Sequence, residues 1–453
     1  MHHLARRLVP GNLRHVLPRV PRRVVILGGG PAGLFCADRL RHNFDVTVVD
    51  AKTYFEYTPG ILRAFGDPSQ HAELTFDYGT VLEGNLGVEF VHADVQRIDP
   101  SPVGGRAGTV AVTLPDGNPS RLTFDYCVVA IGFSNGLWKP RMPGAAVSSS
   151  NARAAVAGEV DERSLPARRR SLRAIREQLA AAPGAVVVGA GLVGVELAAE
   201  LAHFFPRLAV RLVDASAHVL PQLADSSREY ARMYLQHHGV KLELGVPFSP
   251  ESVPAGHVVL WCVGGRSRSQ GLFEDASVLT PRGMIRVNER MQVLHRRPAA
   301  EAKAPQDAAE GKTVGAASAD ADAGGGATAP ELETFGQGHV YAVGDAAAIE
   351  GVPTAQMIFH AEEMGAIAVA SIEAAEDIAS PLALFKTKRE AEAETMPLLC
   401  CTSLGPQDGM FSTQSELLAT GTLAALQKQA IQDTKMGALR GELLSSLMWM
   451  PIH

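Results

Sequence analysis

The chain has 453 residues, enough for about three domains of ordinary size. Hydrophobic residues make up 46% and charged residues 20%, a balance typical of a globular protein with ample core. The formal net charge of −6 argues against a nucleic-acid partner, because nucleic-acid phosphates require a basic face. The five cysteines form no C-x-x-C or C-x4-C pair, so neither a disulfide framework nor a redox dithiol is indicated.

The N-terminal segment, residues 1–21, is basic, and so are the next two residues, Arg22 and Arg23. They contain six arginines and no acidic residue, interleaved with leucine and valine. This composition predicts a mitochondrial presequence; the alternative is a basic tail on a protein that is cytoplasmic or peripheral on a membrane. No apolar run reaches the roughly 18 residues that a membrane-spanning helix needs.

Two segments of the chain repeat the same order of strand, helix and strand. In each, a short β-branched run precedes helical apolar spacing, and a second apolar run ends on an aspartate. The predicted elements are residues 22–27, 32–41 and 45–49, and then residues 185–188, 193–205 and 210–213. This order predicts an α/β fold with two Rossmann-like dinucleotide-binding domains, each built on a parallel sheet.

The first unit carries a G-x-G-x-x-G motif between its strand and its helix. The motif reads Gly28, Gly29, Gly30, Pro31, Ala32, Gly33. Gly28 permits the tight turn, Gly30 lets the backbone approach a pyrophosphate, and Gly33 lets the helix pack on the strand. The helix N-terminus offers free N–H groups to the phosphates. Asp50, at the end of the second strand, is placed to accept from a ribose hydroxyl.

The second unit repeats the motif with Gly189, Gly191 and Gly194. Asp214 ends the strand that follows. A carboxylate there favours a free 2′-hydroxyl and repels a 2′-phosphate, so the pattern favours NADH over NADPH.

With these motifs, the chain resembles the two-dinucleotide flavoprotein reductases of the glutathione-reductase type. That resemblance implies FAD at the first motif and a nicotinamide nucleotide at the second. It also implies that Gly344 and Asp345, in the run Val340-Tyr341-Ala342-Val343-Gly344-Asp345, contact the flavin. The remaining predicted cofactor contacts are Ala51 and Lys52 after the first acidic residue, and the linker glycines Gly132 and Gly264.

Disulfide reductases of this superfamily place two cysteines after the first β-α-β unit, but residues 54–60 contain none. Thiol–disulfide exchange is therefore excluded. Two other branches are similar to this chain: the type II NADH:quinone dehydrogenases, and the apoptosis-inducing-factor-like quinone reductases of the ferroptosis-suppressor type. In the first branch an Ala-Gln pair, here Ala355 and Gln356, lines the quinone site. The second is similar in residues 403–409.

Hydride transfer between stacked rings requires positioning more than acid–base chemistry. The candidate catalytic residues are therefore few. The resemblance implies that Glu196, one turn into the second-motif helix, orients the nicotinamide or relays a proton. Gln356 is a candidate flavin or quinone contact. His360, four residues later on a helix predicted from about residue 355, is a candidate proton donor for quinone reduction. No metal site is predicted.

The predicted domains are an FAD-binding domain of residues 22–148 and 272–385, an NAD(P)H-binding domain of residues 149–271, and a small α+β C-terminal region of residues 386–453. Residues 296–330 are rich in alanine and glycine and predict a disordered insertion. Apolar residues at helical spacing near the C-terminus predict a helix that lies on a membrane surface, packs on the flavin domain or joins a homodimer. They are Met436, Leu439, Leu443, Leu447 and Met450.

Three functions remain open at this point. The first is an FAD-dependent NADH:quinone oxidoreductase peripheral to a membrane, which the Ala355–Gln356 pair and the apolar tail favour. The second is an NADH reductase for a protein acceptor such as a ferredoxin or an electron-transfer flavoprotein. The third is a redox-sensing flavoprotein with slow turnover. The adjacent Cys400 and Cys401 are either redox-sensitive thiols or core residues.

Overall fold

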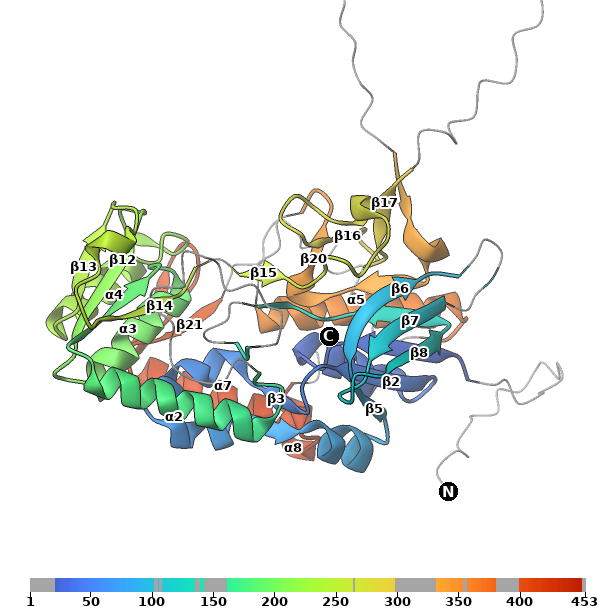
Figure 1. Ribbon diagram of the computed structural model, residues 1–453, viewed down its shortest axis with the longest axis horizontal. Helices are drawn as coiled ribbons and strands as arrows, with labels where there is room; N and C mark the ends of the chain where they lie inside the picture. The colour runs from blue at the N-terminus through green and yellow to red at the C-terminus, as the bar shows by residue number, and fades with distance from the viewer. Residues whose placement is uncertain are drawn as a thin grey trace, which may run out of the picture.

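The computed structural model describes residues 21–101, 105, 108–134, 139–141, 161–263, 265–297, 331–352, 357–379 and 399–449. Two parallel sheets, each covered by helices, form separate parts of the molecule, and the C-terminal elements lie beside them (Figure 1). The prediction of an α/β fold with two Rossmann-like domains and a small α+β C-terminal region is confirmed.

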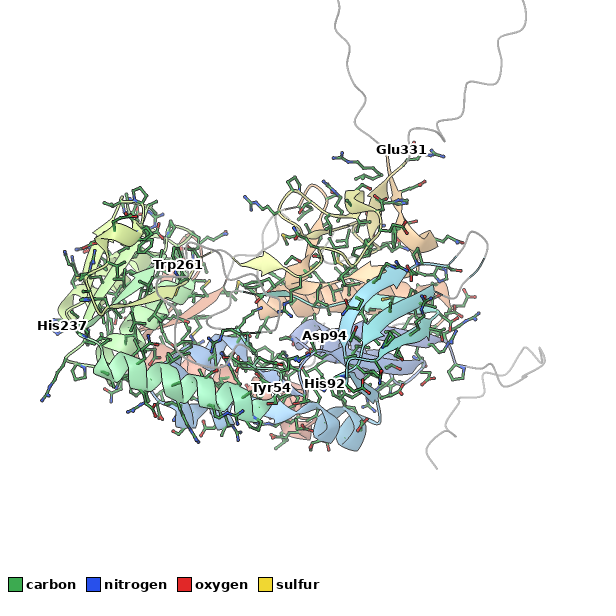
Figure 2. All side chains as sticks on the ribbon, viewed as in Figure 1. Tyr54, His92, Asp94, His237, Trp261 and Glu331 are labelled. Atoms are coloured by element: carbon green, nitrogen blue, oxygen red, sulfur yellow. The ribbon has the colours of Figure 1, made fainter. Side chains whose placement is uncertain are left out.

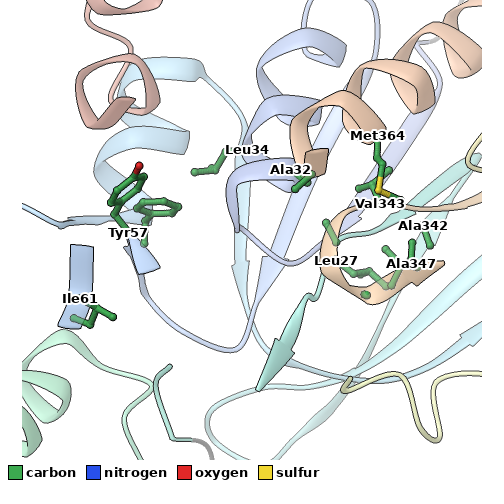
Figure 3. Close-up of a cluster of buried hydrophobic side chains, with 14 of the residues drawn as sticks. Leu27, Ala32, Leu34, Tyr57, Ile61, Ala342, Val343, Ala347 and Met364 are labelled. Atoms are coloured by element: carbon green, nitrogen blue, oxygen red, sulfur yellow. The ribbon is translucent and has the colours of Figure 1, made fainter. Parts of the chain in front are cut away.

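The first sheet, which we call the first unit, has the strand order β19-β9-β1-β2-β5, and all neighbouring pairs are parallel. Its strands are β1 (Arg23–Leu27), β2 (Asp45–Asp50), β5 (Glu89–His92), β9 (Tyr126–Val129) and β19 (Val340–Ala342). Helices α1 (Pro31–Leu40) and α5 (Ile358–Ala375) pack against each other. In the core beneath the first motif, Leu27, Ala32, Val343 and Met364 lie together (Figure 3).

The second unit has the strand order β13-β12-β11-β14, again parallel throughout. Its strands are β11 (Gly184–Val188), β12 (Ala209–Asp214), β13 (Lys241–Leu244) and β14 (Val258–Trp261). Helix α2 (Leu165–Ala181) precedes the sheet, and α3 (Leu192–Phe204) and α4 (Asp225–His237) follow its first two strands. Trp261 and His237 mark this unit in Figure 2.

Smaller elements surround the two sheets. Strands β6 (Asp94–Asp99), β7 (Gly108–Thr113) and β8 (Pro119–Phe124) form an antiparallel sheet. Other short pairs are β3 (Tyr54–Glu56) with β4 (Thr75–Asp77), β10 (Phe133–Ser134) with β15 (Arg266–Ser267), β16 (Ile285–Val287) with β20 (Ala347–Ile349), and β17 (Leu294–Arg296) with β18 (Leu332–Thr334). The β17–β18 pair brackets most of the predicted insertion, whose residues 298–330 lie outside the described residues.

The chain between β3 and β5 is wound into short helices rather than a single α-helix. These are the 3₁₀ segments η1 (Thr58–Phe65) and η2 (Pro68–Ala72) and the π-helix η3 (Gly79–Leu86). They matter for the site because η1 packs against α3 of the second unit.

The C-terminal region is a three-stranded antiparallel sheet followed by two helices. Its elements are β21 (Cys400–Ser403), β22 (Gly409–Ser412), β23 (Leu417–Thr420), α7 (Thr422–Leu439) and α8 (Leu443–Met448). The predicted apolar stripe does not form one helix, because the chain turns at Gly441, whose φ is +82°. Met436 is buried, so that part of the stripe packs inside the molecule. Met450 lies outside the described residues.

A buried ionic cluster joins the first unit to the segment that leads into the second. Arg168 of α2 donates to Glu56 of β3 (Nε–Oε2, 2.9 Å) and to Glu162 (Nη1–Oε2, 3.0 Å). His71 contacts the same Glu56 oxygen at 2.8 Å. Tyr54, beside α2 in Figure 2, donates to the Glu162 carbonyl oxygen. Removing one partner of such a cluster leaves an uncompensated buried charge, so the cluster holds the two units in one arrangement.

Candidate nucleotide and acceptor sites

The first glycine motif, at the end of β1, is closed underneath and open above. Gly28 has φ +102°, and a Cβ there would lie 2.5 Å from the Ala130 carbonyl oxygen. A Cβ on Gly33 would lie 1.9 Å from the Gly28 carbonyl oxygen, so only glycine lets α1 pack this close to the turn. A Cβ on Gly30 would meet no atom of the described residues within 4 Å. The face above Gly30 is therefore a cradle that a ligand can fill.

Helix α1 begins at this cradle with an uncapped N-terminus. Gly30 is its N-cap residue and supplies no side-chain hydrogen bond, and Pro31 opens the first turn. The N–H groups of the first turn have no acceptor within the helix. Together with the helix dipole they form an anion site suited to a pyrophosphate.

Asp50 lies at the carboxyl end of β2 beside the same turn. Its carboxylate accepts from the backbone N–H groups of Gly29 and Lys52, both at 2.8 Å. The Tyr78 hydroxyl donates to the Gly29 carbonyl oxygen at 2.7 Å and lies 3.4 Å from Asp50 Oδ2. The Lys52 ammonium contacts Asp50 at 3.5 Å, and the Ala51 carbonyl oxygen contacts His92 Nε2 at 3.0 Å. The acidic end of the first site is thus enclosed by an aromatic ring and a cation.

The second motif has the same backbone geometry. Gly189 has φ +108°, and a Cβ on Gly194 would lie 1.7 Å from the Gly189 carbonyl oxygen. A Cβ on Gly191 would again meet nothing within 4 Å, and Gly191 is the uncapped N-cap of α3. The linker glycine Gly264 lies outside the described residues.

Asp214 at the end of β12 occupies the position equivalent to Asp50. It accepts from the backbone N–H groups of Ala190 and Ser216, both at 2.6 Å. The residues that follow it, Ala215, Ala217 and His218, are exposed. The second acidic end is therefore open to solvent.

The late Gly-Asp pair follows β19 and lies near Lys139. Gly344 has φ +69° and Gly132 has φ +61°, so both turns use the left-handed region. The Lys139 ammonium lies 3.9 Å from Asp345 Oδ2 and 3.6 Å from the centre of the Phe133 ring. Burial lowers the pKa of Lys139 to about 8 and raises the pKa of Asp345. Each group is thereby moved towards its neutral form.

Glu196, in the second turn of α3, meets the C-terminal region. Its Oε1 accepts from the Lys428 ammonium of α7 at 2.5 Å and from the Ser403 N–H of β21 at 2.8 Å. This ion pair is partly buried, with side-chain exposures of 17% for Lys428 and 12% for Glu196. It joins a helix of the second unit to a helix that follows more than 200 residues later.

This ion pair lines a pocket between η1, α3, β21 and α7. The space in the pocket that a water-sized molecule can occupy is about 20 Å³, and the pocket is partly open to solvent. Its walls combine apolar residues with charged and amide side chains. They include Pro59, Leu62, Leu74, Ala425, Arg63, Gln70, Glu196, Glu200, Lys428 and Gln432.

Residues 22–297, well over half of the chain, match the sequence family described as pyridine nucleotide-disulphide oxidoreductase. The chain belongs to this family. The match confirms the resemblance to the two-dinucleotide flavoprotein reductases. The family description names a pyridine nucleotide, in agreement with the nicotinamide nucleotide predicted at the second motif.

The chain is also similar, at low sequence identity, to individual proteins. Apoptosis-inducing factor homolog B of Dictyostelium discoideum is 28% identical over 185 residues, which span 41% of this chain but only 40% of that protein. The type II NADH:quinone oxidoreductase Ndh of Mycobacterium tuberculosis is 27% identical over 73% of this chain and 68% of that protein. A solved structure of NDH2 from Plasmodium falciparum in complex with NADH matches with a TM-score of 0.60 and 11% identity, covering 94% of this chain and 97% of that one. At that identity the structural match shows the fold.

The structure describes only one of the three other residues predicted for the acceptor site, His360. Ala355 and Gln356 lie outside the described residues, and α5 begins at Ile358 rather than near residue 355. His360 lies in the first turn of α5 with its ring centre 6.1 Å from that of Phe359. It is not among the residues that line the pocket. The roles predicted for Gln356 and His360 stay predictions.

The thiols near the pocket are in their protonated form at neutral pH. Cys400 and Cys401 are adjacent on β21, and both are free. Burial raises the pKa of Cys400 to about 11 and also raises that of Cys401. Since the thiolate is the reactive form, these cysteines do not supply disulfide chemistry. Among the described residues, no group of three or more His, Cys, Asp or Glu side chains is arranged to hold a metal ion.

Sequence reasoning missed Lys428, Lys139 and Tyr78. Lys428 and Lys139 lie in no recognisable motif, and their partners are remote in the sequence. Tyr78 could not be predicted from the sequence, because its contact with the motif is seen only in the structure. A Cβ on Gly29 would lie 2.6 Å from the Tyr78 ring. No local pattern reports such contacts.

Proposed function

We propose that this protein oxidises NADH through bound FAD and passes the electrons to a quinone. The observation that carries this proposal is the Glu196–Lys428 ion pair in a mainly polar pocket that also has apolar side chains on its walls. A quinone oxygen needs a proton as it gains electrons, and an ammonium beside an apolar ring site supplies one. The ring itself requires the apolar surface that Leu62, Leu74 and Ala425 offer.

The residues of the first motif fit FAD. The open face at Gly30 and the uncapped N-terminus of α1 suit its pyrophosphate, and Asp50 suits the adenosine ribose. Gly132, Gly344 and Asp345 would hold the flavin half, as the family resemblance implies. When bound, FAD accepts a hydride from the nicotinamide and releases electrons to the acceptor.

The protein's own groups then have distinct roles. Glu196 holds the Lys428 ammonium in place. Lys428 donates a proton from Nζ to the quinone oxygen. The Ser403 N–H donates to the Glu196 carboxylate and fixes its position. The carboxylate in turn keeps the Lys428 ammonium at the pocket. Asp214, with its carboxylate at the ribose end of the second motif, selects NADH.

Surface residues support a membrane-bound quinone. Helix α7, which lines the pocket through Ala425 and Lys428, exposes Leu423 at 68% and Leu426 at 63%. Helix α8 exposes Leu444 and Met448. These side chains suit contact with a lipid surface, and we propose that the protein is peripheral to a membrane. None of the described helices is long and apolar enough to cross a bilayer. Mitochondrial import also stays a proposal, because residues 1–20 lie outside the described residues.

The test is anaerobic stopped-flow spectroscopy of the holoenzyme. We expect NADH to bleach the flavin band faster than NADPH does, and a short-chain ubiquinone to restore it promptly. Lys428→Met should leave bleaching unchanged and slow the restoration about a hundredfold, whereas Gln427→Met on the same helix should change neither phase. Bleaching that ubiquinone does not reverse would overturn the quinone proposal and favour a protein acceptor or a redox sensor.

A further inference from the structure

Glu200 is a buried carboxylate that the proposed function does not use. It lies on α3 one turn after Glu196, and its side chain is 3% exposed. Its Oε1 accepts from Arg63 Nε of η1 at 3.2 Å. Its Oε2 is buried and has no hydrogen-bond partner among the residues the structure describes. A buried polar atom without a partner is costly, so its retention calls for an explanation.

Glu200 faces the same pocket as the ion pair. Residues four apart on a helix lie on one face, and Glu196 and Glu200 both line the pocket with Lys428. The space in the pocket that a water-sized molecule can occupy is about 20 Å³, which admits water because one molecule needs about 10–15 Å³ on this measure. Water there finds polar partners in the ion pair, and the Glu200 side chain lies on the same wall.

The charges around Glu200 come from every element packed against it. Arg63 approaches from η1 and Lys428 from α7, Tyr234 is near on α4, and Glu196 precedes it on α3. Burial raises the pKa of Glu200 and Glu196 adds to the rise, whereas Arg63 and Lys428 oppose it. The balance keeps the carboxyl protonated at a higher pH than an exposed glutamate.

We propose that Glu200 is the proton donor that recharges Lys428 after each acceptor reduction, through the water of the pocket they both line. This inference rests on the proposed function, because it assigns the proton source of the same site. Under this proposal, both residues that act on Lys428 lie on α3. Glu196 holds the ammonium in place, and Glu200 returns a proton to it.

The proton balance of the reaction requires such a source. The overall change is NADH + H⁺ + quinone → NAD⁺ + quinol. NADH supplies the two electrons and one hydrogen nucleus as hydride, so one proton must come from solvent. In our proposal Lys428 Nζ gives that proton to the quinone oxygen, the Glu200 carboxyl gives its proton to Lys428, and solvent at the pocket mouth reprotonates Glu200.

The main test compares Glu200→Gln with wild-type holoenzyme in the two half-reactions, at pH values from the ordinary glutamate pKa of 4.5 upwards. In the wild type, restoration of the flavin band by short-chain ubiquinone should slow as pH rises, because Glu200 loses its proton. Glu200→Gln should keep the NADH bleaching rate, slow restoration at least tenfold, and remove that pH dependence. Glu200→Asp, which keeps a titratable group, should retain the pH dependence at a reduced rate.

The matched control is Glu373→Gln. Glu373 is also a buried glutamate, but it lies on α5 and accepts from Asn43 at 3.2 Å, away from the pocket. It should leave both half-reactions and their pH profiles unchanged. Because Glu200→Asp retains the carboxyl, it keeps the test decisive if Glu200→Gln folds poorly.

A second readout does not depend on turnover. Infrared spectra of the oxidised holoenzyme, recorded as pH is raised from 4.5, should show a protonated carboxyl band that persists to higher pH than that of an exposed glutamate. Glu200→Gln should lose this band and Glu373→Gln should keep it. If wild-type flavin is restored by ubiquinone but Glu200→Gln has the same rate and pH profile, the role of Glu200 is overturned. If ubiquinone fails to restore even the wild type, the proposed function fails, and that failure is seen before any variant is made.

Discussion

The two glycine motifs have nearly the same backbone but different surroundings. At both, a Cβ on the middle glycine, Gly30 or Gly191, meets no protein atom, and the following helix begins uncapped. At the first, the acidic residue lies under Tyr78, which is fully buried, and beside Lys52. At the second, exposed residues follow Asp214.

We propose that this difference distinguishes a site for a retained cofactor from a site for one that exchanges. The glycines provide the turn, the helix start and the approach to a pyrophosphate, and they do so equally in both units. How long the ligand remains depends on what covers its adenosine end, because a covered ligand must displace packed side chains to leave. The closed first site suits a retained flavin nucleotide, and the open second site suits a nicotinamide nucleotide that leaves in every turnover.

The largest expected effect comes from filling each cradle. Gly30→Val and Gly191→Val place a side chain where no protein atom lies, at backbone angles that any residue adopts. Gly30→Val should purify without flavin, and Gly191→Val should keep its flavin but lose bleaching by NADH. Absorbance spectra and circular dichroism measure both. If Gly191→Val remains folded but also loses flavin, the assignment of different nucleotides to the two motifs is wrong.

The next effect concerns the ionic cluster that joins the two units. Glu56→Gln should lower the free energy of unfolding by about 3 kcal/mol at neutral pH, because Arg168 is left buried with one fewer charge partner. Burial alone would raise the pKa of Glu56, but Arg168 and His71 outweigh it and lower it to about 2.

The sign of the pH dependence follows from that lowered pKa. The stabilising contribution of Glu56 is present above its ordinary pKa of 4.5 and is lost as pH falls from there towards about 2. The difference between wild type and Glu56→Gln in denaturant unfolding should therefore shrink over this range. A difference that is constant with pH would contradict the ionic account. Glu331→Gln, at an exposed glutamate marked in Figure 2, is the control.

A smaller effect tests the open end of the second site. Asp214→Ala removes two hydrogen bonds from backbone N–H groups and the carboxylate that we predict to bind the ribose. The KM for NADH should rise about tenfold, corresponding to roughly 1.4 kcal/mol, and the preference over NADPH should fall. Flavin content should not change. An unchanged ratio of NADH to NADPH activity would remove Asp214 from coenzyme selection.

The smallest effect tests the closed end of the first site. Tyr78→Phe removes the hydroxyl that donates to the Gly29 carbonyl oxygen, at a cost of about 1 kcal/mol. Flavin should dissociate several times faster under mild denaturant, with no change in the KM for NADH. Tyr126→Phe, which loses a buried hydrogen bond to Glu376 elsewhere in the first unit, is the matched control and should retain flavin like the wild type.

The sequence predicts the parts of this molecule that depend on neighbours in the chain. The β-α-β order and the acidic strand ends are local patterns, and both motifs formed the turns their glycines imply. The family match then follows from the order of the motifs. Asp50 and Asp214 both contact the glycine turns, although the roles predicted for them in binding stay predictions.

The remaining features depend on contacts between distant segments. Lys428 lies 232 positions after Glu196, and Arg168 lies 112 positions after Glu56. Neither pair follows a spacing that could have revealed it. The C-terminal apolar spacing also misled, because it did not show that Gly441 would end the helix or that Met436 would face inward. Helical periodicity identifies an apolar face but not what covers it.

Helix α3 begins at the cradle of Gly191 and reaches Glu196 about 6 Å further along its axis. The nucleotide cradle and the proposed acceptor pocket therefore share one rigid element. In evolutionary terms the two are not free to drift separately: a substitution that tilts α3 to admit a different coenzyme also moves the carboxylate that holds Lys428. Lineages that change coenzyme preference in this fold should do so at the loop after β12, where the chain is exposed, and leave α3 untouched.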